Sequence, residues 1–194
     1  NTYKSMGLVP EVFSEEILQK LTGHLAIGHV RYSTTGASNI INTQPLMVNH
    51  KGNTLAVAHN GNLVNSIGLR RSLEEQGSIF QTTMDSEIVL HLMAKSAHLG
   101  LERALWESFS SLQGAYSLLL MTENTMVAVR DPNGFRPLCL GKLNNGGWIV
   151  ASETCALDLI EATYVRDIKP GEILIITEKE MLSIYPWSKR NSSF

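Results

Sequence analysis

The order of segments in this chain predicts an α+β fold with stacked antiparallel β-sheets and helices on the outside. A strand and a hairpin pattern come first, helical patterns fill the middle, and strand patterns separated by turns dominate after residue 114. The chain has 194 residues, of which 43% are hydrophobic and 18% are charged, so residues 1–194 are predicted to form a single domain. No Gly-rich phosphate loop follows a strand, which argues against nucleotide binding by that route.

The first sixty residues predict a short helix, a strand and a hairpin. Ser14 suits a helix N-cap because its hydroxyl can accept from a backbone N–H, and two glutamates follow in the first turn. Pro45 ends a polar loop. The predicted segments are a helix over 14–21, a strand over 25–32, a loop over 33–44, and hairpin strands over 46–49 and 54–59.

Three helices are predicted in the middle of the chain. Asn65 is a candidate N-cap for the first, and Gly77 follows its end. Either Asp85 or Ser86 begins the second, whose apolar residues recur at helical spacing. The predicted helices cover 65–76, a stretch that begins at 85 or 86, and 102–112.

The last eighty residues alternate between strands and turns. Residues 115–121 are almost continuously apolar, which is typical of a strand buried on both faces. A turn is predicted over 131–134, and a short helix over 154–161. The predicted strands are 115–121, 126–130, 138–143, 148–151, 164–168, 172–177 and 181–185.

Composition excludes several classes of function. The net charge is −2, without a basic patch, so nucleic acid is not an expected partner. No apolar run is long enough to cross a membrane, and no signal-peptide pattern opens the chain. Cys139 and Cys155 form neither a disulfide framework nor a metal-ligand spacing, and the histidines add none. We therefore expect no metal, no membrane and a reduced, cytoplasmic setting.

The stretch 55–63 is the most informative in the sequence. An apolar run ends in His59, Asn60, Gly61 and a second asparagine. Asn-Gly predicts a tight turn at the end of a strand, and the turn alone is a sufficient structural explanation. Such a turn can also aim a side-chain amide and a backbone N–H at one point. That pair of donors is what an oxyanion hole requires.

Two charged residues complete a candidate site. Arg31 lies at the end of the predicted strand 25–32, and a guanidinium binds a carboxylate through two parallel hydrogen bonds. Asp85 stands at a helix start, where it can hold an ammonium group. With the oxyanion hole, they describe a site for a free amino acid with a reactive side-chain carbonyl. A surface ion pair for Arg31 and a simple N-cap for Asp85 are the structural alternatives.

Five motifs resemble the glutaminase domain of the amidophosphoribosyltransferase family. Residues 28–34 (Gly-His-Val-Arg-Tyr-Ser-Thr) and 59–62 (His-Asn-Gly-Asn) are similar to motifs of class II glutamine amidotransferases in general. Residues 77–82, 131–138 and 151–158 are more specific to this family. The resemblance covers essentially all 194 residues.

The resemblance implies a fold, a reaction and a set of site residues. The fold is a four-layer α/β/β/α sandwich of the N-terminal-nucleophile hydrolase type, with two mainly antiparallel sheets. The reaction is release of ammonia from L-glutamine. The resemblance implies that Arg31, with Thr34 nearby, holds the substrate carboxylate, that Asp85 holds the ammonium, and that Asn60 and Gly61 form the oxyanion hole.

A second domain of this family passes the ammonia to phosphoribosyl pyrophosphate and makes 5-phosphoribosylamine, the first committed step of purine synthesis. The family's nucleophile is an N-terminal cysteine whose own amine is the base, but this chain opens with Asn1. We therefore expect a fragment truncated at both ends and inactive by itself. Mg²⁺ is expected with the phosphoribosyltransferase domain, an iron–sulfur cluster occurs in some members, and the full-length protein is expected to be a homo-oligomer.

Three other interpretations of the remaining features stay open. The chain can belong to another class II amidotransferase, such as glucosamine-6-phosphate synthase or asparagine synthetase, although motifs 131–138 and 151–158 are not expected there. It can be a binding module that keeps a glutamine pocket without catalysis. Cys155, at a predicted helix start, can be an activated thiol, but a buried structural role is favoured, and Cys139 is predicted to be core.

Overall fold

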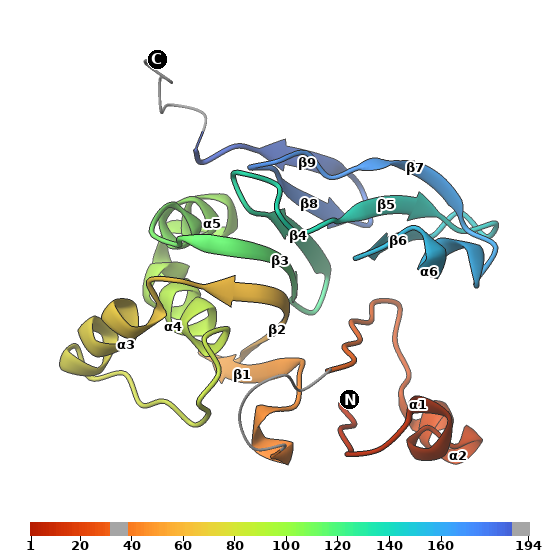
Figure 1. Cartoon of the computed structure of the whole chain (residues 1–194), viewed down its shortest axis with the longest axis horizontal. Coiled ribbons are helices and arrows are strands. Elements are labelled where there is room, and N and C mark those ends of the chain that lie inside the picture. Colours follow the sequence, from red (N-terminus) through yellow and green to blue (C-terminus); the bar gives the residue numbers. More distant parts are fainter. Residues whose placement is uncertain (32–38, 188–194) are drawn as a thin grey trace.

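Two antiparallel sheets form the centre of the molecule in the computed structural model, which describes residues 1–31 and 39–187 (Figure 1). The larger sheet has six strands in the order β1-β2-β3-β4-β8-β9, and the smaller has the order β6-β5-β7. The strands are β1 (Leu46–His50), β2 (Asn53–Leu63), β3 (Gly114–Met121), β4 (Thr125–Arg130), β5 (Cys139–Lys142), β6 (Trp148–Ala151), β7 (Thr163–Asp167), β8 (Ile173–Thr177) and β9 (Met181–Ile184).

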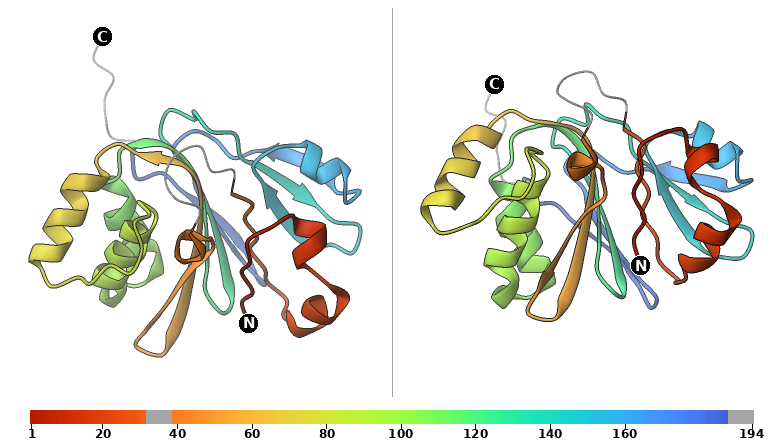
Figure 2. Two further views of the ribbon diagram at one scale, coloured as in Figure 1. Left: turned by 60° about the horizontal axis from the view of Figure 1, so that its bottom comes forward. Right: turned by 90° about the horizontal axis from the view of Figure 1, so that it is seen from below.

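Helices lie on both outer sides of the two sheets. One group, α3 to α5, covers a face of the six-stranded sheet, while α1, α2 and α6 lie on the opposite side of the molecule (Figure 2). This gives the α/β/β/α layer order. The helices are α1 (Val9–Val12), α2 (Glu15–Lys20), α3 (Ser66–Glu75), α4 (Glu87–Ser96), α5 (Leu101–Ser110) and α6 (Cys155–Asp158), with 3-10 turns η1 (Ile40–Asn42) and η2 (Ala97–Leu99).

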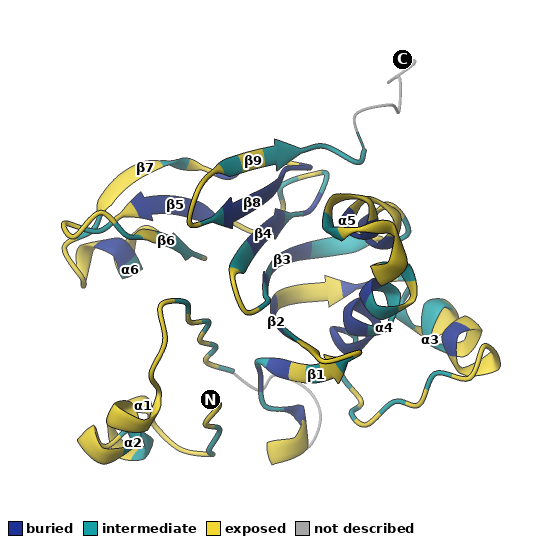
Figure 3. Ribbon diagram, turned by 180° about the vertical axis from the view of Figure 1, so that it is seen from behind, coloured by how far each residue is buried: buried dark blue, intermediate teal, exposed yellow. Residues whose placement is uncertain are grey.

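The six-stranded sheet has an apolar core on each face. Leu118 and Leu120 of β3 belong to the cluster that packs against α4 and α5, whereas Leu119 contacts the cluster between the two sheets. Figure 3 shows buried residues concentrated along the central strands, and exposed ones over α1 and α2. The prediction that 115–121 is a strand buried on both faces is confirmed.

Most of the predicted elements are confirmed with small shifts at their ends. The hairpin, the helices and the strands after residue 114 all form. Ser14 caps α2 by accepting from the Ile17 N–H at 3.4 Å. Asn65 occupies the N-cap position of α3, as predicted, but its side chain makes no capping hydrogen bond. It bonds Ser111 O and Gln113 N instead, and so joins α3 to the turn before β3. The sequence prediction also missed α1.

The strand predicted over 25–32 is wrong as far as the structure describes it. Residues 25–31 belong to neither sheet, and residue 32 lies outside the described residues. Apolar alternation makes a segment suitable for a sheet, but a strand also needs a neighbour to complete its backbone hydrogen bonds. Val30 is 77% exposed, so this segment also fails to bury its apolar side chains among the described residues.

An ion pair between a buried carboxylate and a partly exposed guanidinium joins the two sheets. Arg166 of β7 donates Nη1 and Nη2 to the carboxylate of Glu172, before β8, at 2.8 and 2.7 Å. The Glu172 carboxylate also accepts from Ser183 Oγ at 2.6 Å and Lys169 N at 2.7 Å. Burial opposes ionisation of Glu172, but these donors outweigh it, and the pKa of the carboxyl is lowered. The charge is therefore kept where β7, β8 and β9 meet.

The predicted turn over 131–134 is confirmed as a structural feature. Gly134 N donates to Asp131 O at 3.0 Å, and Asn133 N donates to Asp131 Oδ1 at 2.9 Å. Arg130 fastens the loop by donating to the backbone oxygens of Gly134, Arg136 and Ile168.

Among the described residues, none of the helices has the length and apolar character needed to cross a membrane.

Candidate functional site

Strand β2 carries the polar group that the sequence placed at a turn. The predicted turn is wrong, because β2 continues through Asn60 and Gly61 to Leu63. Gly61 has φ 142°, and a Cβ on it would lie 2.1 Å from Ala115 O of β3. A glycine is needed here because the neighbouring strand passes too close for a side chain, not because the chain reverses.

His59 and Asp85 form the polar centre of the site. His59 is 4% exposed, and its Nδ1 lies 3.3 Å from Asp85 Oδ1. Asp85 Oδ2 accepts from Leu63 N at 2.8 Å. The N-cap position of α4 is occupied by Ser86 instead, so the view of Asp85 as only a helix cap is wrong. The carboxylate before α4 is thus bound to β2.

The environment of Asp85 keeps it charged. Burial by itself would raise the pKa of this carboxyl. The hydrogen bond and charge of His59, together with backbone N–H groups of Leu63 and Ser86, outweigh burial, so the pKa of Asp85 is lowered. An ionised carboxylate only accepts hydrogen bonds, so the proton between the two groups belongs to His59 Nδ1. An anion at this place can bind an ammonium group.

Asn60 carries an amide on the strand that binds Asp85. It is exposed, next to buried His59 in β2, and pairs with Ser117 of β3. Its side chain makes no hydrogen bond to another described residue, so the amide can donate to a ligand. The structure therefore brings three predicted site residues together on one strand end: Asn60, Gly61 and, through His59, Asp85.

Arg31 lies at the edge of the described part. It forms no ion pair within residues 1–31 and 39–187, so the alternative of a surface ion pair has no support there. Its segment reaches β2 through His29, whose Nε2 lies 3.1 Å from His59 O. Thr34 lies outside the described residues, so its position stays a prediction, as does the carboxylate-binding role of Arg31.

Sequence reasoning missed Gln44. Its side chain is buried and makes two hydrogen bonds to the backbone of His59. Gln44 Oε1 accepts from His59 N at 2.6 Å, and Nε2 donates to His59 O at 3.2 Å. Burial lowers the pKa of His29, the other side chain on that carbonyl. No local pattern marks these contacts, because they join residues 15 and 30 positions apart.

The cysteines behave differently from each other. Cys139 is buried in β5, as predicted, and burial raises the pKa of its thiol. Cys155 is exposed, so the buried role predicted for it is wrong. The helix it begins spans only Cys155–Asp158, and only Leu157 of that helix is buried. The described residues contain no group of three or more His, Cys, Asp or Glu able to hold a metal ion.

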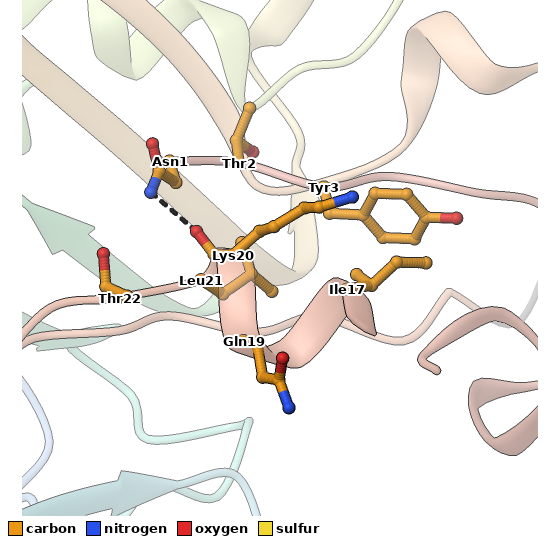
Figure 4. A pocket seen from close by; sticks show the side chains of 8 residues that line it. All are labelled: Asn1, Thr2, Tyr3, Ile17, Gln19, Lys20, Leu21 and Thr22. Carbon is orange, nitrogen blue, oxygen red and sulfur yellow. Dashed lines mark hydrogen bonds between the residues drawn. The ribbon is translucent and has the colours of Figure 1, made fainter. Parts of the chain in front are cut away.

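The N-terminal region holds a separate cavity of about 440 Å³. Figure 4 shows its lining, including the hydrogen bond of 2.7 Å from Asn1 Nδ2 to Lys20 O. None of Arg31, Asn60 and Asp85 lines it, so it is distinct from the candidate site. It is lined by Asn1, Thr2, Tyr3, Ile17, Gln19, Lys20, Leu21 and Thr22.

A family model described as a glutamine amidotransferase domain matches residues 29–159, about two thirds of the chain. The chain belongs to the glutamine amidotransferase domain family. The match includes the predicted site residues Arg31, Asn60, Gly61 and Asp85.

Curated members of this family include amidophosphoribosyltransferases. Amidophosphoribosyltransferase 2, chloroplastic, of Arabidopsis thaliana is 54% identical over 175 residues, covering 90% of this chain and 31% of that protein. The Bacillus subtilis amidophosphoribosyltransferase is 49% identical over 182 residues, covering 93% of this chain and 38% of that protein. The chain thus spans about a third of the length of these relatives.

Solved structures agree with the glutamine amidotransferase assignment. One, titled as the allosteric regulatory enzyme of purine biosynthesis, superposes with a TM-score of 0.88 at 48% identity. Another, a Bacillus subtilis glutamine phosphoribosylpyrophosphate amidotransferase complexed with ADP and GMP, has a TM-score of 0.85 at 48% identity. Each match covers 93% of this chain and 39% of the other. The α/β/β/α fold of the N-terminal-nucleophile hydrolase type is confirmed.

Proposed function

We propose that these residues are the glutaminase part of an amidophosphoribosyltransferase. They release ammonia from L-glutamine, and a further domain uses it to convert phosphoribosyl pyrophosphate into 5-phosphoribosylamine for purine synthesis. The observation that carries the glutaminase role is the anion of Asp85, bound through His59 to the strand that also carries Asn60. The names of relatives at 49–54% identity support the choice of acceptor.

The role proposed for each site residue follows from the chemistry of its side chain. Arg31, with Thr34, binds the α-carboxylate of glutamine, and Asp85 binds the α-ammonium. The side-chain amide of Asn60 and the backbone N–H of Gly61 donate to the oxygen of the substrate amide as it becomes an oxyanion. Binding both ends of the amino acid directs its side-chain carbonyl at these donors.

The proposed reaction requires an activated nucleophile. In class II amidotransferases it is a cysteine with a free α-amine. Cys139 is buried in β5. Cys155 has Glu153 Oε2 at 3.6 Å from its Sγ and no amine base described beside it. We propose that such a cysteine gives its thiol proton to the α-amine and attacks the amide carbon, and that ammonia leaves with that proton. Water then hydrolyses the thioester, which releases glutamate and restores the thiol.

A glutamine-binding module without catalysis is the second candidate, because neither cysteine adjoins Asp85 or Asn60 in any described contact. Isothermal titration of residues 1–194 with L-glutamine, beside an assay of ammonia release by the whole enzyme, separates the two. Binding with release supports the glutaminase, and binding without release supports the module. Stoichiometric labelling of Cys155 by diazo-oxo-norleucine would assign the nucleophile to that thiol instead.

The remaining expectations concern the whole protein. We propose a homo-oligomer that contains a phosphoribosyltransferase domain and works with Mg²⁺ in the cytoplasm. The two cysteines, neither in a disulfide, are consistent with a reducing setting. Plant relatives carry the word chloroplastic in their names. Size-exclusion chromatography with light scattering on the whole enzyme tests its oligomeric state.

A further inference from the structure

The short segment 42–44 contacts both halves of the candidate site. From its last residue, the side-chain amide of Gln44 makes two hydrogen bonds to the backbone of His59, at 2.6 and 3.2 Å. These bonds fix the residue that precedes Asn60. Gln44 is 4% exposed, so water does not compete for either bond.

From its first residue, the same segment holds the loop before α4. Asn42 Nδ2 donates to Thr83 Oγ1 at 3.0 Å, and Thr83 N donates to Asn42 Oδ1 at 3.3 Å. Asn42 is 8% exposed. Thr83 lies two residues before Asp85, so the bond restrains the approach of that carboxylate to β2.

A second anchor holds the loop from the helix side. The buried carboxylate of Glu87 accepts from Gln81 N at 2.7 Å, and from Thr82 N and Oγ1 at 2.8 and 2.7 Å. Phe80, in the family-specific motif 77–82, contacts Arg70, whose Cζ lies 4.1 Å from the ring centroid, and His91, whose ring centroid lies 4.2 Å away. The loop is therefore fixed on α3 and α4. The contact of Asn42 with Thr83 joins this loop to segment 42–44, which is bonded to β2 through Gln44.

We propose that Asn42 and Gln44 are positioning residues that hold the ammonium-binding Asp85 and the oxyanion donor Asn60 at a fixed separation. The role of this brace rests on the proposed function, because that separation matters only if one amino acid spans the two groups. Neither side chain has a described bond to Asp85 or Asn60; each acts through Thr83 or His59. The brace prepares the site before glutamine arrives.

The chemistry of the two amides gives a matched pair of substitutions. Asn42→Asp keeps its contact, because Thr83 N and Thr83 Oγ1 both donate to a carboxylate. Gln44→Glu loses half of its contact, because the carbonyl oxygen of His59 needs a donor. Each substitution adds one buried negative charge. A side chain that only fills space would make the two variants behave alike.

Nuclear magnetic resonance on residues 1–194 measures the brace without catalysis. In Gln44→Ala we expect the His59 amide to exchange with solvent about tenfold faster, the change equivalent to one net hydrogen bond. In Gln44→Glu the carboxylate still accepts from His59 N, so this exchange should stay slow while the bond to His59 O is lost. We also expect the pKa of Asp85 to rise toward the ordinary aspartate value as His59 moves away. Asn42→Asp should keep both the exchange rate of the His59 amide and the pKa of Asp85. The control is Gln76→Ala, because the side-chain amide of Gln76 is exposed and its described bonds are to Ser72 and Lys95.

Calorimetric titration with L-glutamine then connects the brace to function. Gln44→Ala and Asn42→Ala should each weaken binding about tenfold, while Asn42→Asp and Gln76→Ala bind as the unsubstituted chain. Failure of the unsubstituted chain to bind glutamine would refute the proposed function. The amide exchange of His59 and the pKa of Asp85 would still show whether Asn42 and Gln44 position the two groups. An unchanged pKa of Asp85 in both Gln44 variants, or equal behaviour of Asn42→Asp and Gln44→Glu, would overturn the brace.

Discussion

His59 Nδ1 lies 3.3 Å from Asp85 Oδ1, and this contact joins the loop before α4 to strand β2. The pair lies largely out of solvent, with side-chain exposures of 1% and 17%. A carboxylate that is desolvated but hydrogen-bonded keeps its charge and its direction. The contact therefore fixes one anion against the strand that carries Asn60, and an anion is what recognition of an amino-acid ammonium requires.

The lowered pKa of Asp85 predicts how glutamine binding depends on pH. A lowered pKa means that the carboxylate stays ionised at and above the ordinary aspartate range, so affinity should be constant between about pH 7 and pH 5. Calorimetric titration across that range checks this. A loss of affinity with a midpoint above pH 5 would show that the pKa of the binding carboxyl is raised, and would assign the ammonium to another group.

Arg31→Lys in the whole enzyme should weaken the use of glutamine. A lysine point charge cannot reproduce the two parallel hydrogen bonds of a guanidinium to a carboxylate. Synthesis from free ammonia bypasses the pocket and should keep its rate. Steady-state kinetics with each nitrogen source measure the difference. Equal glutamine kinetics in variant and parent would remove Arg31 from the site.

Asn60→Ala should act on the transition state. Loss of one oxyanion donor costs on the order of 3 kcal/mol of barrier, or about a hundredfold in turnover. The loss should appear in kcat, because the donor is needed when charge develops on the oxygen. Glutamate release by the whole enzyme provides both constants. An unchanged kcat with a higher KM would make Asn60 a group that binds the ground state.

The sequence predicted the frame of this fold better than the contacts that make the site. Alternation and helical spacing are local signals, so β3 and α4 were found near their observed bounds. The turn predicted from Asn-Gly at 60–61 is wrong because Gly61 is required by the close approach of β3. That strand lies more than fifty residues later in the chain, so no local pattern shows the contact. The two hydrogen bonds from Gln44 to the His59 backbone could not be predicted from local patterns for the same reason.

Acid should remove part of the stability of the domain through Glu172. Its folded pKa is lowered, so its contribution is complete above the unfolded value of about 4.3 and is lost as pH falls through the folded pKa. Glu172→Ala leaves the donors Lys169 N and Ser183 Oγ without their charged acceptor and should cost about 1.5–3 kcal/mol at pH 7. Urea unfolding between pH 7 and pH 3 measures both effects.

Glu16→Ala is the matched control for Glu172. Glu16 pairs with Lys20 at 2.7 Å, but the two side chains are 79% and 69% exposed. A surface pair of this kind contributes at most about 0.5 kcal/mol. If the two variants lost the same stability, or if the variant at Glu172 kept the parent's full dependence on acid pH, the inter-sheet ion pair would not stabilise the fold.

The anion of Asp85 is the centre of the proposed glutaminase, and Asp85→Asn in the whole enzyme tests it most directly. Asparagine keeps the size and the acceptor for Leu63 N but removes the charge that holds the substrate ammonium. The measurement is phosphoribosylamine formed from glutamine and, separately, from ammonia. We predict that the glutamine-dependent rate falls at least about tenfold while the ammonia-dependent rate is retained. An unchanged glutamine-dependent rate would contradict the site described here.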